Sequence, residues 1–222
     1  MTAKHTGLGQ PMAPPGETPA TPLSPTFFAR DTSRVARELL GQLLVRRIDA
    51  TTIVARIVET EAYLGAEDRA SHAWAGRRSA RNAALYLPPG TAYVYFIYGM
   101  HFCLNVVANT DGGGGAVLFR AAEVVAGHDE VRRRRGFVDR EPRSGDLLGG
   151  PGRLCRGLGV DRGFDGLPFA GGGLELVAAP PVADPAVAVA PRVGIAYAGE
   201  AAAWPLRFAL RGHRDVSRPQ LR

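Results

Sequence analysis

The longest run of alternating apolar and polar positions is Thr51–Tyr63 (TTIVARIVETEAY), which is rich in β-branched residues and predicts a strand. Its alternation places three apolar side chains on one face: Ile53, Ala55 and Ile57. If the strand persists to its end, the same face continues through Glu59, Glu61 and Tyr63. A shorter strand is predicted just before it, over Leu43–Ile48. The pattern therefore predicts a long strand that is apolar for most of its length and ends in two carboxylates and a phenol.

A β-hairpin is predicted over residues 92–108, with its turn around Tyr98, Gly99, Met100 and His101. Its tip therefore carries a large aromatic side chain. After a glycine run at 112–115, a further strand is predicted over 116–121, with Leu118 and Arg120 on the same side.

Helices are predicted over 31–41, where Asp31 and the residues after it can cap free amides, over 127–135, and from Gly150-Pro151-Gly152 onward. Three probable strands follow, at 174–178, 187–196 and 205–210. Strands and helices mix without regular βαβ alternation. We therefore expect a single α+β domain with a mixed, largely antiparallel curved sheet flanked by helices.

Residues 1–25 hold six of the 17 prolines and almost no large apolar residues. Such a composition predicts a disordered tail, with the folded domain over 26–222. The two cysteines, Cys103 and Cys155, lie far apart with no CxxC or paired histidines, so we expect reduced thiols, no metal and no cofactor. The most apolar stretch is interrupted by Gly99, His101 and Asn105, so no membrane span is expected and the cytoplasm is the predicted location.

The charge of the chain is uneven. It carries 27 basic and 21 acidic residues, a net charge of +6, and a pI near 9.9. Residues 69–156 hold 13 Arg against 7 acids, so this segment carries the whole excess. A basic segment of this kind favours a polyanionic partner, although a basic surface can also serve solubility alone. Lys4 is the only lysine, so Schiff-base chemistry has no candidate lysine in the folded body.

The first candidate site is the carboxylate pair at the end of the long strand. A partly buried carboxylate, Glu59 or Glu61, could abstract a proton from water, with Arg120 as its counter-charge. A guanidinium stays protonated, so Arg120 could orient a water molecule but could not act as a general acid. The same spacing also fits a solvated strand end with a structural ion pair.

The second candidate site interleaves aromatic and basic residues. It comprises Tyr63, His72, Trp74, Tyr86, Tyr93, Tyr95 and Tyr98 with Arg69, Arg77, Arg78 and Arg81. Aromatic faces stack on nucleobases and guanidiniums pair with phosphates, although each tyrosine singly could fill a core. At a hairpin tip, Tyr98 is suited to wedge into a DNA groove. The amides at Gly150-Pro151-Gly152, with Arg153, could bind a phosphate, and the Arg132–Arg135 run fits a solvated helix end better than a phosphate clamp.

Three segments together resemble a known family: residues 56–107, with ETEAYLG and YVYFIYGMHFCLN, then AVLFRAAEV (116–124) and GPGRLCRGLGV (150–160). They resemble the alkyladenine (3-methyladenine) DNA glycosylases of the single-domain type, from about residue 28 to 210. The resemblance implies a base-excision repair enzyme that flips alkylated or deaminated purines out of double-stranded DNA and hydrolyses the N-glycosidic bond. It also implies a fold like the C-terminal domain of methionyl-tRNA formyltransferase, with a protruding DNA-binding hairpin.

The resemblance assigns roles by position. Glu61, rather than Glu59, would activate water, and Arg120 would help to hold that water. Tyr63 would stack on one side of the extruded base, with His72 and Tyr95 on the other. The remaining positions follow from the same match: Asn105 would line the pocket and disfavour guanine, Tyr98 would fill the gap in the duplex, and Arg77 and Arg81 would lie near the DNA backbone. Arg153, from its place at the predicted helix start, is expected as a further backbone contact.

Because Lys4 lies in the predicted tail, we expect a monofunctional glycosylase without lyase activity. The expected DNA interface needs only one copy of the protein, so we also expect a monomer. Two rival interpretations remain. One is a non-catalytic lesion or RNA binder on the same scaffold. The other is a metal-dependent nuclease with Glu59, Glu61 and Asp68 as ligands.

Overall fold

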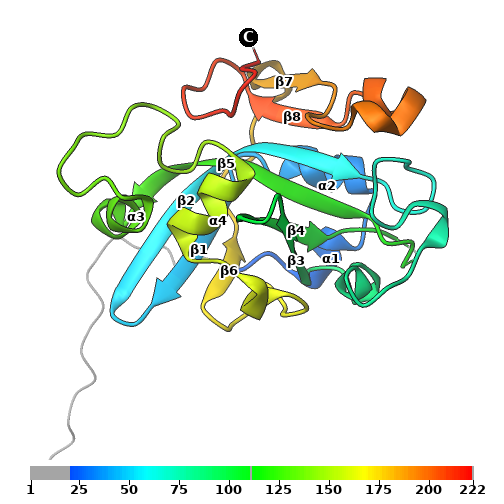
Figure 1. Ribbon diagram of the computed structural model, residues 1–222, viewed down its shortest axis with the longest axis horizontal. Coiled ribbons are helices and arrows are strands. Elements are labelled where there is room, and N and C mark those ends of the chain that lie inside the picture. The colour runs from blue at the N-terminus through cyan, green and yellow to red at the C-terminus, as the bar shows by residue number, and fades with distance from the viewer. Residues whose placement is uncertain (1–20, 111, 222) are drawn as a thin grey trace, which may run out of the picture.

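An antiparallel sheet of eight strands organises the chain, and the computed structural model describes residues 21–110 and 112–221 (Figure 1). The main path of the sheet runs, in spatial order, through β3 (Ala92–Ile97), β4 (His101–Val107), β5 (Ala116–Ala126), β2 (Thr51–Tyr63), β1 (Leu43–Ile48) and β6 (Leu174–Val177). Two more strands extend it, since β8 (Arg207–Leu210) pairs with the end of β2, and β7 (Val187–Ala190) pairs with β8. All these pairings are antiparallel, so the expected α+β domain is confirmed.

The helices are short. They are α1 (Pro25–Phe28), α2 (Thr32–Glu38), α3 (His128–Arg135) and α4 (Pro151–Leu158), with 3-10 turns η1 (Trp74–Gly76), η2 (Ala83–Tyr86), η3 (Arg162–Phe164), η4 (Asp184–Ala186) and η5 (Ala196–Ala203). As predicted, Asp31 caps α2, because its carboxylate accepts the backbone N–H of Arg34 at 2.8 Å. Figure 1 shows α4 in front of the sheet and α2 behind β2. Their apolar sides join one core with the sheet, through residues such as Leu39, Ile57 and Leu154.

Strand β2 changes phase between Ile57 and Thr60, where register shifts interrupt its pairing with β5. Beyond this point Thr60 and Ala62 continue the buried face, and the Thr60 hydroxyl donates to the backbone oxygen of Ala36 in α2 at 2.8 Å. The sequence predicted instead that this face would continue through Glu59, Glu61 and Tyr63. That prediction is wrong, because an irregularity of this kind inverts the alternation of the strand. Both carboxylates therefore lie in the sheet centre with their side chains away from the α2 core.

Several boundaries differ from the expected ones. Strand β5 extends to Ala126, and β7 ends at Ala190, so the chain from Pro191 onward forms a loop where a strand to residue 196 was predicted. Of the predicted tail, residues 1–20 lie outside the described residues. Its last part does not stand apart from the domain, since Pro22 bridges to Val177 and Leu23 donates its N–H to the oxygen of Leu176, both in β6.

Both cysteines are free and buried. Within residues 21–110 and 112–221, no helix has the length and apolar character needed to cross a membrane.

Candidate active site

A cavity of about 480 Å³ opens between the β3–β4 hairpin, the first half of β5, the start of α4 and the loop after β7. Its volume lies within the range typical of small-molecule sites. The wall contains most of the predicted pocket residues, and these are Tyr63, His72, Tyr95, Tyr98, Asn105 and Arg120. The loop after β7 adds residues that the sequence did not single out, among them Val193, Ile195 and Tyr197.

Glu61 lies directly behind this wall and is fully buried. Its Oε2 accepts the hydroxyl of Tyr63 at 2.9 Å, and its Oε1 accepts the backbone N–H of Val193 at 2.7 Å. Nη1 of Arg120 lies 3.2 Å from the same Oε1. Three donors on cavity-lining residues thus converge on one carboxylate.

Glu59 differs sharply from Glu61 although the two lie only two residues apart. Its Oε1 accepts Nε of Arg120 at 2.8 Å and Nε of Arg207 at 2.7 Å, and its Oε2 accepts the backbone N–H of Ser217 at 2.7 Å. The Ser217 hydroxyl also donates to Oε1 at 3.0 Å. The three partners of Glu61 all line the cavity, whereas Arg207 and Ser217, which hold the two oxygens of Glu59, do not. Glu59 is therefore an anchor for Arg120. Alternation alone could not separate the two residues; the partners from β8 and the C-terminal segment do so.

The aromatic residues of the wall are held by contacts with one another. His72 and Tyr95 form an edge-to-face pair with ring centroids 4.7 Å apart. Nδ1 of His72 lies 2.7 Å from the hydroxyl of Tyr93, which fixes the orientation of the imidazole. Burial, reinforced by the nearby charge of Arg81, lowers the pKa of His72 below its ordinary value. The imidazole is therefore neutral at pH 7.

Burial raises the pKa of Tyr63 well above its ordinary value, and the adjacent Glu61 charge adds to this effect. The phenol of Tyr63 therefore stays protonated and donates to Glu61. Burial also raises the pKa of Tyr95 well above its ordinary value. Both rings are thus neutral, flat surfaces suited to stacking.

Asn105 lies on β4 in the floor of the cavity. Its Nδ2 donates to the backbone oxygen of Tyr93 at 2.9 Å and sits 3.5 Å from that of Cys103. Because both hydrogens of the amide nitrogen are directed at the hairpin backbone, the orientation of the side chain is fixed by the hairpin itself.

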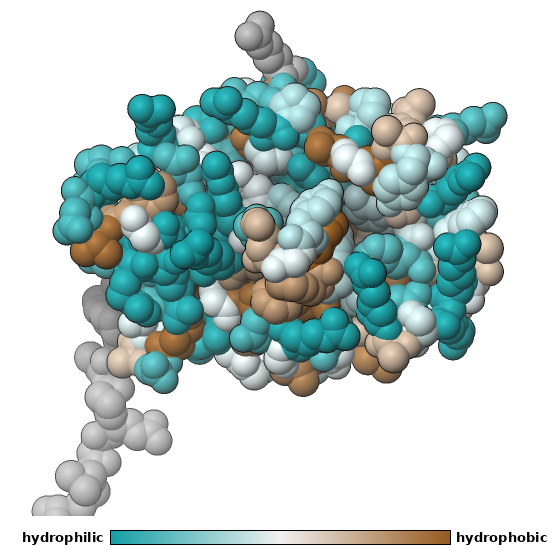
Figure 2. Space-filling view, in the orientation of Figure 1, coloured by the Kyte–Doolittle hydropathy of each residue, from teal (hydrophilic) through white to brown (hydrophobic). Residues whose placement is uncertain are grey.

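The hairpin tip is exposed. Tyr98 is 78% exposed with φ of 53°, and Met100 is 68% exposed. Figure 2 shows apolar side chains gathered near the centre of the molecular face in view, with hydrophilic residues around them. Tyr98 and Tyr197 both lie at the cavity wall and are largely exposed, so the mouth of the cavity has an aromatic rim.

The predicted backbone-contact arginines divide into two groups. Arg77 and Arg81 are exposed in the segment before β3, and the guanidinium of Arg77 lies 4.9 Å from the Trp74 ring centroid. Arg153 is half-exposed but donates to the oxygen of Gly145 at 2.9 Å, so part of its capacity is used within the chain. The Arg132–Arg135 run is occupied by local partners, including Glu130 and Glu141, as expected of a solvated helix end.

The structure does not bring together the ligands of the metal-nuclease interpretation. Glu59 and Glu61 share Arg120, and Asp68 is paired with Arg192 in the core. Each carboxylate therefore already faces a guanidinium, which opposes cation binding.

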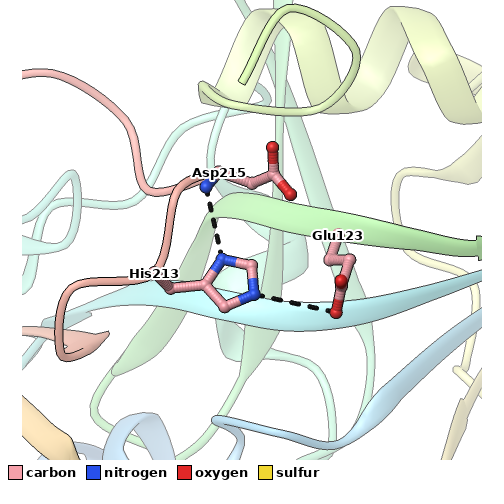
Figure 3. A group of neighbouring side chains, drawn as sticks. All are labelled: Glu123, His213 and Asp215. Carbon is pink, nitrogen blue, oxygen red and sulfur yellow. Dashed lines mark hydrogen bonds and ion pairs between the residues drawn. The ribbon is translucent and has the colours of Figure 1, made fainter. Parts of the chain in front are cut away.

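One other group among the described residues has the composition of a metal site: Glu123, His213 and Asp215 (Figure 3). The backbone N–H of Asp215 donates to Nδ1 of His213 at 3.2 Å, so the ring carries its proton on Nε2, which faces Glu123 at 3.7 Å. The Asp215 carboxylate in turn accepts the N–H of Gly145 at 2.7 Å. These contacts favour a histidine–carboxylate tie over a metal site, and none of the three residues lines the cavity.

Comparison with known proteins matches residues 26–214 to the model of the family described as methylpurine-DNA glycosylase. The chain is 44% identical over 204 residues to the mouse protein named DNA-3-methyladenine glycosylase, covering 88% of this chain. It is 42% identical over 205 residues to the human protein of that name, covering 89% of this chain and 68% of the human protein. The chain spans 61% of the length of the mouse protein. A bacterial relative from Anaeromyxobacter dehalogenans, named "Putative 3-methyladenine DNA glycosylase", is 48% identical over 198 residues, with 89% of this chain and 86% of that protein covered.

Proposed function

Since this chain belongs to the methylpurine-DNA glycosylase family, we propose that it is a repair enzyme that releases alkylated purine bases from double-stranded DNA. The observation that carries the proposal is the buried carboxylate of Glu61, held by Tyr63, Arg120 and Val193 at the wall of an aromatic cavity. The cavity opens beside an exposed tyrosine on a basic protein, which suits a substrate with a polyanionic backbone and a flat extruded base.

In this proposal the damaged purine rotates out of the duplex and enters the cavity between Tyr63 and the pair of His72 and Tyr95. Extrusion costs a few kcal/mol and costs least for a poorly paired base, so part of the selectivity arises before the pocket is reached. A cationic alkylpurine gains about 0.5–2 kcal/mol from aromatic faces. The neutral His72 adds no repulsion of its own to such a base.

Hydrolysis needs one activated water. Glu61 accepts a proton from this water as the water oxygen attacks C1′ of the deoxyribose, and Arg120 helps to hold the water. The C1′–N bond breaks and its electron pair passes to the purine nitrogen. An alkylated cationic purine leaves as a neutral base, so no general acid is required for it.

The β3–β4 hairpin serves as the DNA-binding element, and Tyr98 at its tip fills the space vacated by the extruded base. Exposure of 78% leaves Tyr98 free to enter a groove. Arg77 and Arg81 contact the phosphate backbone, as does the half-exposed Arg153 once its contact with Gly145 is exchanged.

Asn105 contributes to selectivity against normal guanine. Its amide is fixed by the hairpin backbone, so it cannot move aside for an exocyclic amine on the base. Normal guanine, which carries such an amine and lacks the positive charge of an alkylated purine, is therefore disfavoured in the pocket.

The reaction stops at base release. The single lysine, Lys4, lies outside the domain matched to the family, so no lysine amine is available for an imine intermediate. Borohydride treatment during turnover is expected to trap no covalent protein–DNA adduct, whereas a trapped adduct would contradict a monofunctional mechanism. One copy of the chain contains every proposed group, so the enzyme acts as a monomer, which sedimentation with and without DNA tests.

The test of the proposal is release of free base from a methylated duplex, with the unmodified duplex as control. The glycosylase releases 3-methyladenine or 7-methylguanine and does so equally in the presence of a chelator. Binding of the lesion without base release would favour the non-catalytic interpretation, and chelator-sensitive strand cleavage would favour a nuclease.

A further inference from the structure

Asp68 and Arg192 form a fully buried ion pair at the edge of the cavity, 124 positions apart in sequence. Nη2 of Arg192 donates to Oδ1 of Asp68 at 2.9 Å, and Nη1 donates to Oδ2. The same carboxylate accepts the backbone N–H groups of Leu64 and Ala70, both at 3.0 Å. Asp68 thus fixes the loop after β2, which carries His72, to the loop after β7.

Arg192 also contacts Ala62 and Tyr63, the two residues that follow Glu61 in β2. Its Nη1 donates to the backbone oxygen of Ala62 at 2.9 Å, and its guanidinium carbon lies 4.7 Å from the ring centroid of Tyr63. The next residue along the chain, Val193, supplies the N–H that donates to Glu61 at 2.7 Å. One side chain therefore backs the Tyr63 ring and sets the position of a backbone donor for the carboxylate.

Stability alone is a weak reason for such a pair. Taking two charges out of water costs several kcal/mol each, and well-packed apolar residues often replace a buried pair with no loss of stability. What apolar residues could not reproduce is the set of directional bonds that Arg192 makes to Asp68, Ala62 and the oxygen of Ala201, the last at 3.1 Å.

We infer that the Asp68–Arg192 pair is a positioning device, which holds the Val193 N–H and the Tyr63 hydroxyl on the two oxygens of Glu61. The inference rests on the proposed function in so far as Glu61 is the base. Neither member of the pair lines the cavity, so both act through Tyr63 and Val193.

The pair is expected to affect rate more than binding. A misplacement of about 1 Å in a reacting group can cost on the order of 100-fold in rate. Arg120 from β5, Tyr63 from β2 and Cys103 from β4 also lie near Glu61, and the variants leave all of them in place.

The experiment compares wild type with Asp68→Leu/Arg192→Met, which leaves no unpaired charge, and with Arg192→Lys. The control is Gln42→Met, because Gln42 is buried, bonds to both backbone groups of Ala179 and does not line the cavity. Single-turnover base release is measured together with binding of the lesion duplex and thermal unfolding.

The double variant is expected to fold and to bind the duplex within about threefold, while its rate falls on the order of 10- to 100-fold. The rate of Arg192→Lys, which keeps the charge, is expected to lie between those of the wild type and the double variant. Gln42→Met is expected to alter only thermal unfolding. A folded double variant with the wild-type rate would overturn the inference.

A second measurement does not depend on activity. Amide exchange at Val193 reports its hydrogen bond to Glu61 directly. The double variant is expected to speed this exchange. If the exchange does not change, the inference fails even where base release confirms the proposed function; if it speeds up in a protein that releases no base, the proposed function fails alone.

Discussion

The guanidinium of Arg120 lies 3.2 Å from the Glu61 carboxylate and reaches it from a side chain that is itself anchored in the core. Its Nε is occupied by Glu59, which leaves Nη1 directed at Glu61 beside the cavity. Strand β2 thus carries both Glu59, which anchors Arg120, and Glu61, which Nη1 of Arg120 contacts. Two carboxylates so close in sequence therefore have different partners, which is the basis for proposing Glu61 alone as the catalytic base.

Besides Arg120, two groups donate to Glu61: the Tyr63 hydroxyl and the backbone N–H of Val193. Replacing Tyr63 with Phe removes the first of these hydrogen bonds and keeps the aromatic ring. A hydrogen bond to a charged group contributes about 1.5–3 kcal/mol, so the single-turnover rate is expected to fall roughly 10- to 100-fold. Binding of the lesion duplex should change little, because the stacking surface remains. The matched control is Tyr197→Phe, which removes an exposed hydroxyl at the cavity rim. Equal effects of the two substitutions on rate would contradict the role given to the Tyr63 hydroxyl.

The His72 ring is expected to titrate below the ordinary value of about 6.5, because burial and the nearby Arg81 both oppose its protonation. Below that pH the unfolded chain binds a proton that folded His72 resists, so this residue lowers stability as pH falls and has no such effect at neutral pH. NMR titration of the ring checks the direction. Arg81→Gln removes one of the two causes, so the pKa of His72 should rise. Titration at or above 6.5 in the wild type would show that the imidazole is not held neutral.

Tyr98→Ala should weaken capture of the extruded base without affecting the fold. The side chain is exposed, and surface substitutions usually change stability by less than about 0.5 kcal/mol. Its loss as a wedge is expected to reduce affinity for the lesion duplex on the order of tenfold. Fluorescence of a 2-aminopurine placed beside the lesion reports unstacking, with Tyr98→Phe as the control that keeps the ring. Unchanged fluorescence and affinity in Tyr98→Ala would show that the hairpin tip does not take part in the DNA contact.

Much of the sheet could be predicted from the sequence. Strands β1 and β2 were predicted with their observed bounds, because β-branched residues and alternation fix them locally. The phase change within β2 could not be predicted, since it depends on how β5 pairs with that strand. Local patterns also placed Tyr98 at a turn and Leu118 beside Arg120 on one side of β5, and both features recur at the cavity.

The parts of the site that the sequence did not reveal come from contacts between distant segments. Val193 donates a backbone N–H to Glu61 from a loop that alternation predicted as strand, and a backbone donor leaves no trace in residue identity. The sequence indicates Asp68 only as a possible metal ligand, and its partner Arg192 lies in an otherwise apolar stretch. This lone arginine among apolar residues is the one signal that the sequence offers.

The most direct test of the account is single-turnover base release by Glu61→Gln on a methylated duplex. The amide keeps the size of the side chain and can still accept from Val193, but it cannot take a proton from water. We predict that the variant folds and still binds and unstacks the lesion, while its rate falls by a factor on the order of 100 or more. Retention of the wild-type rate by a folded Glu61→Gln protein would contradict the assignment of Glu61 as the base.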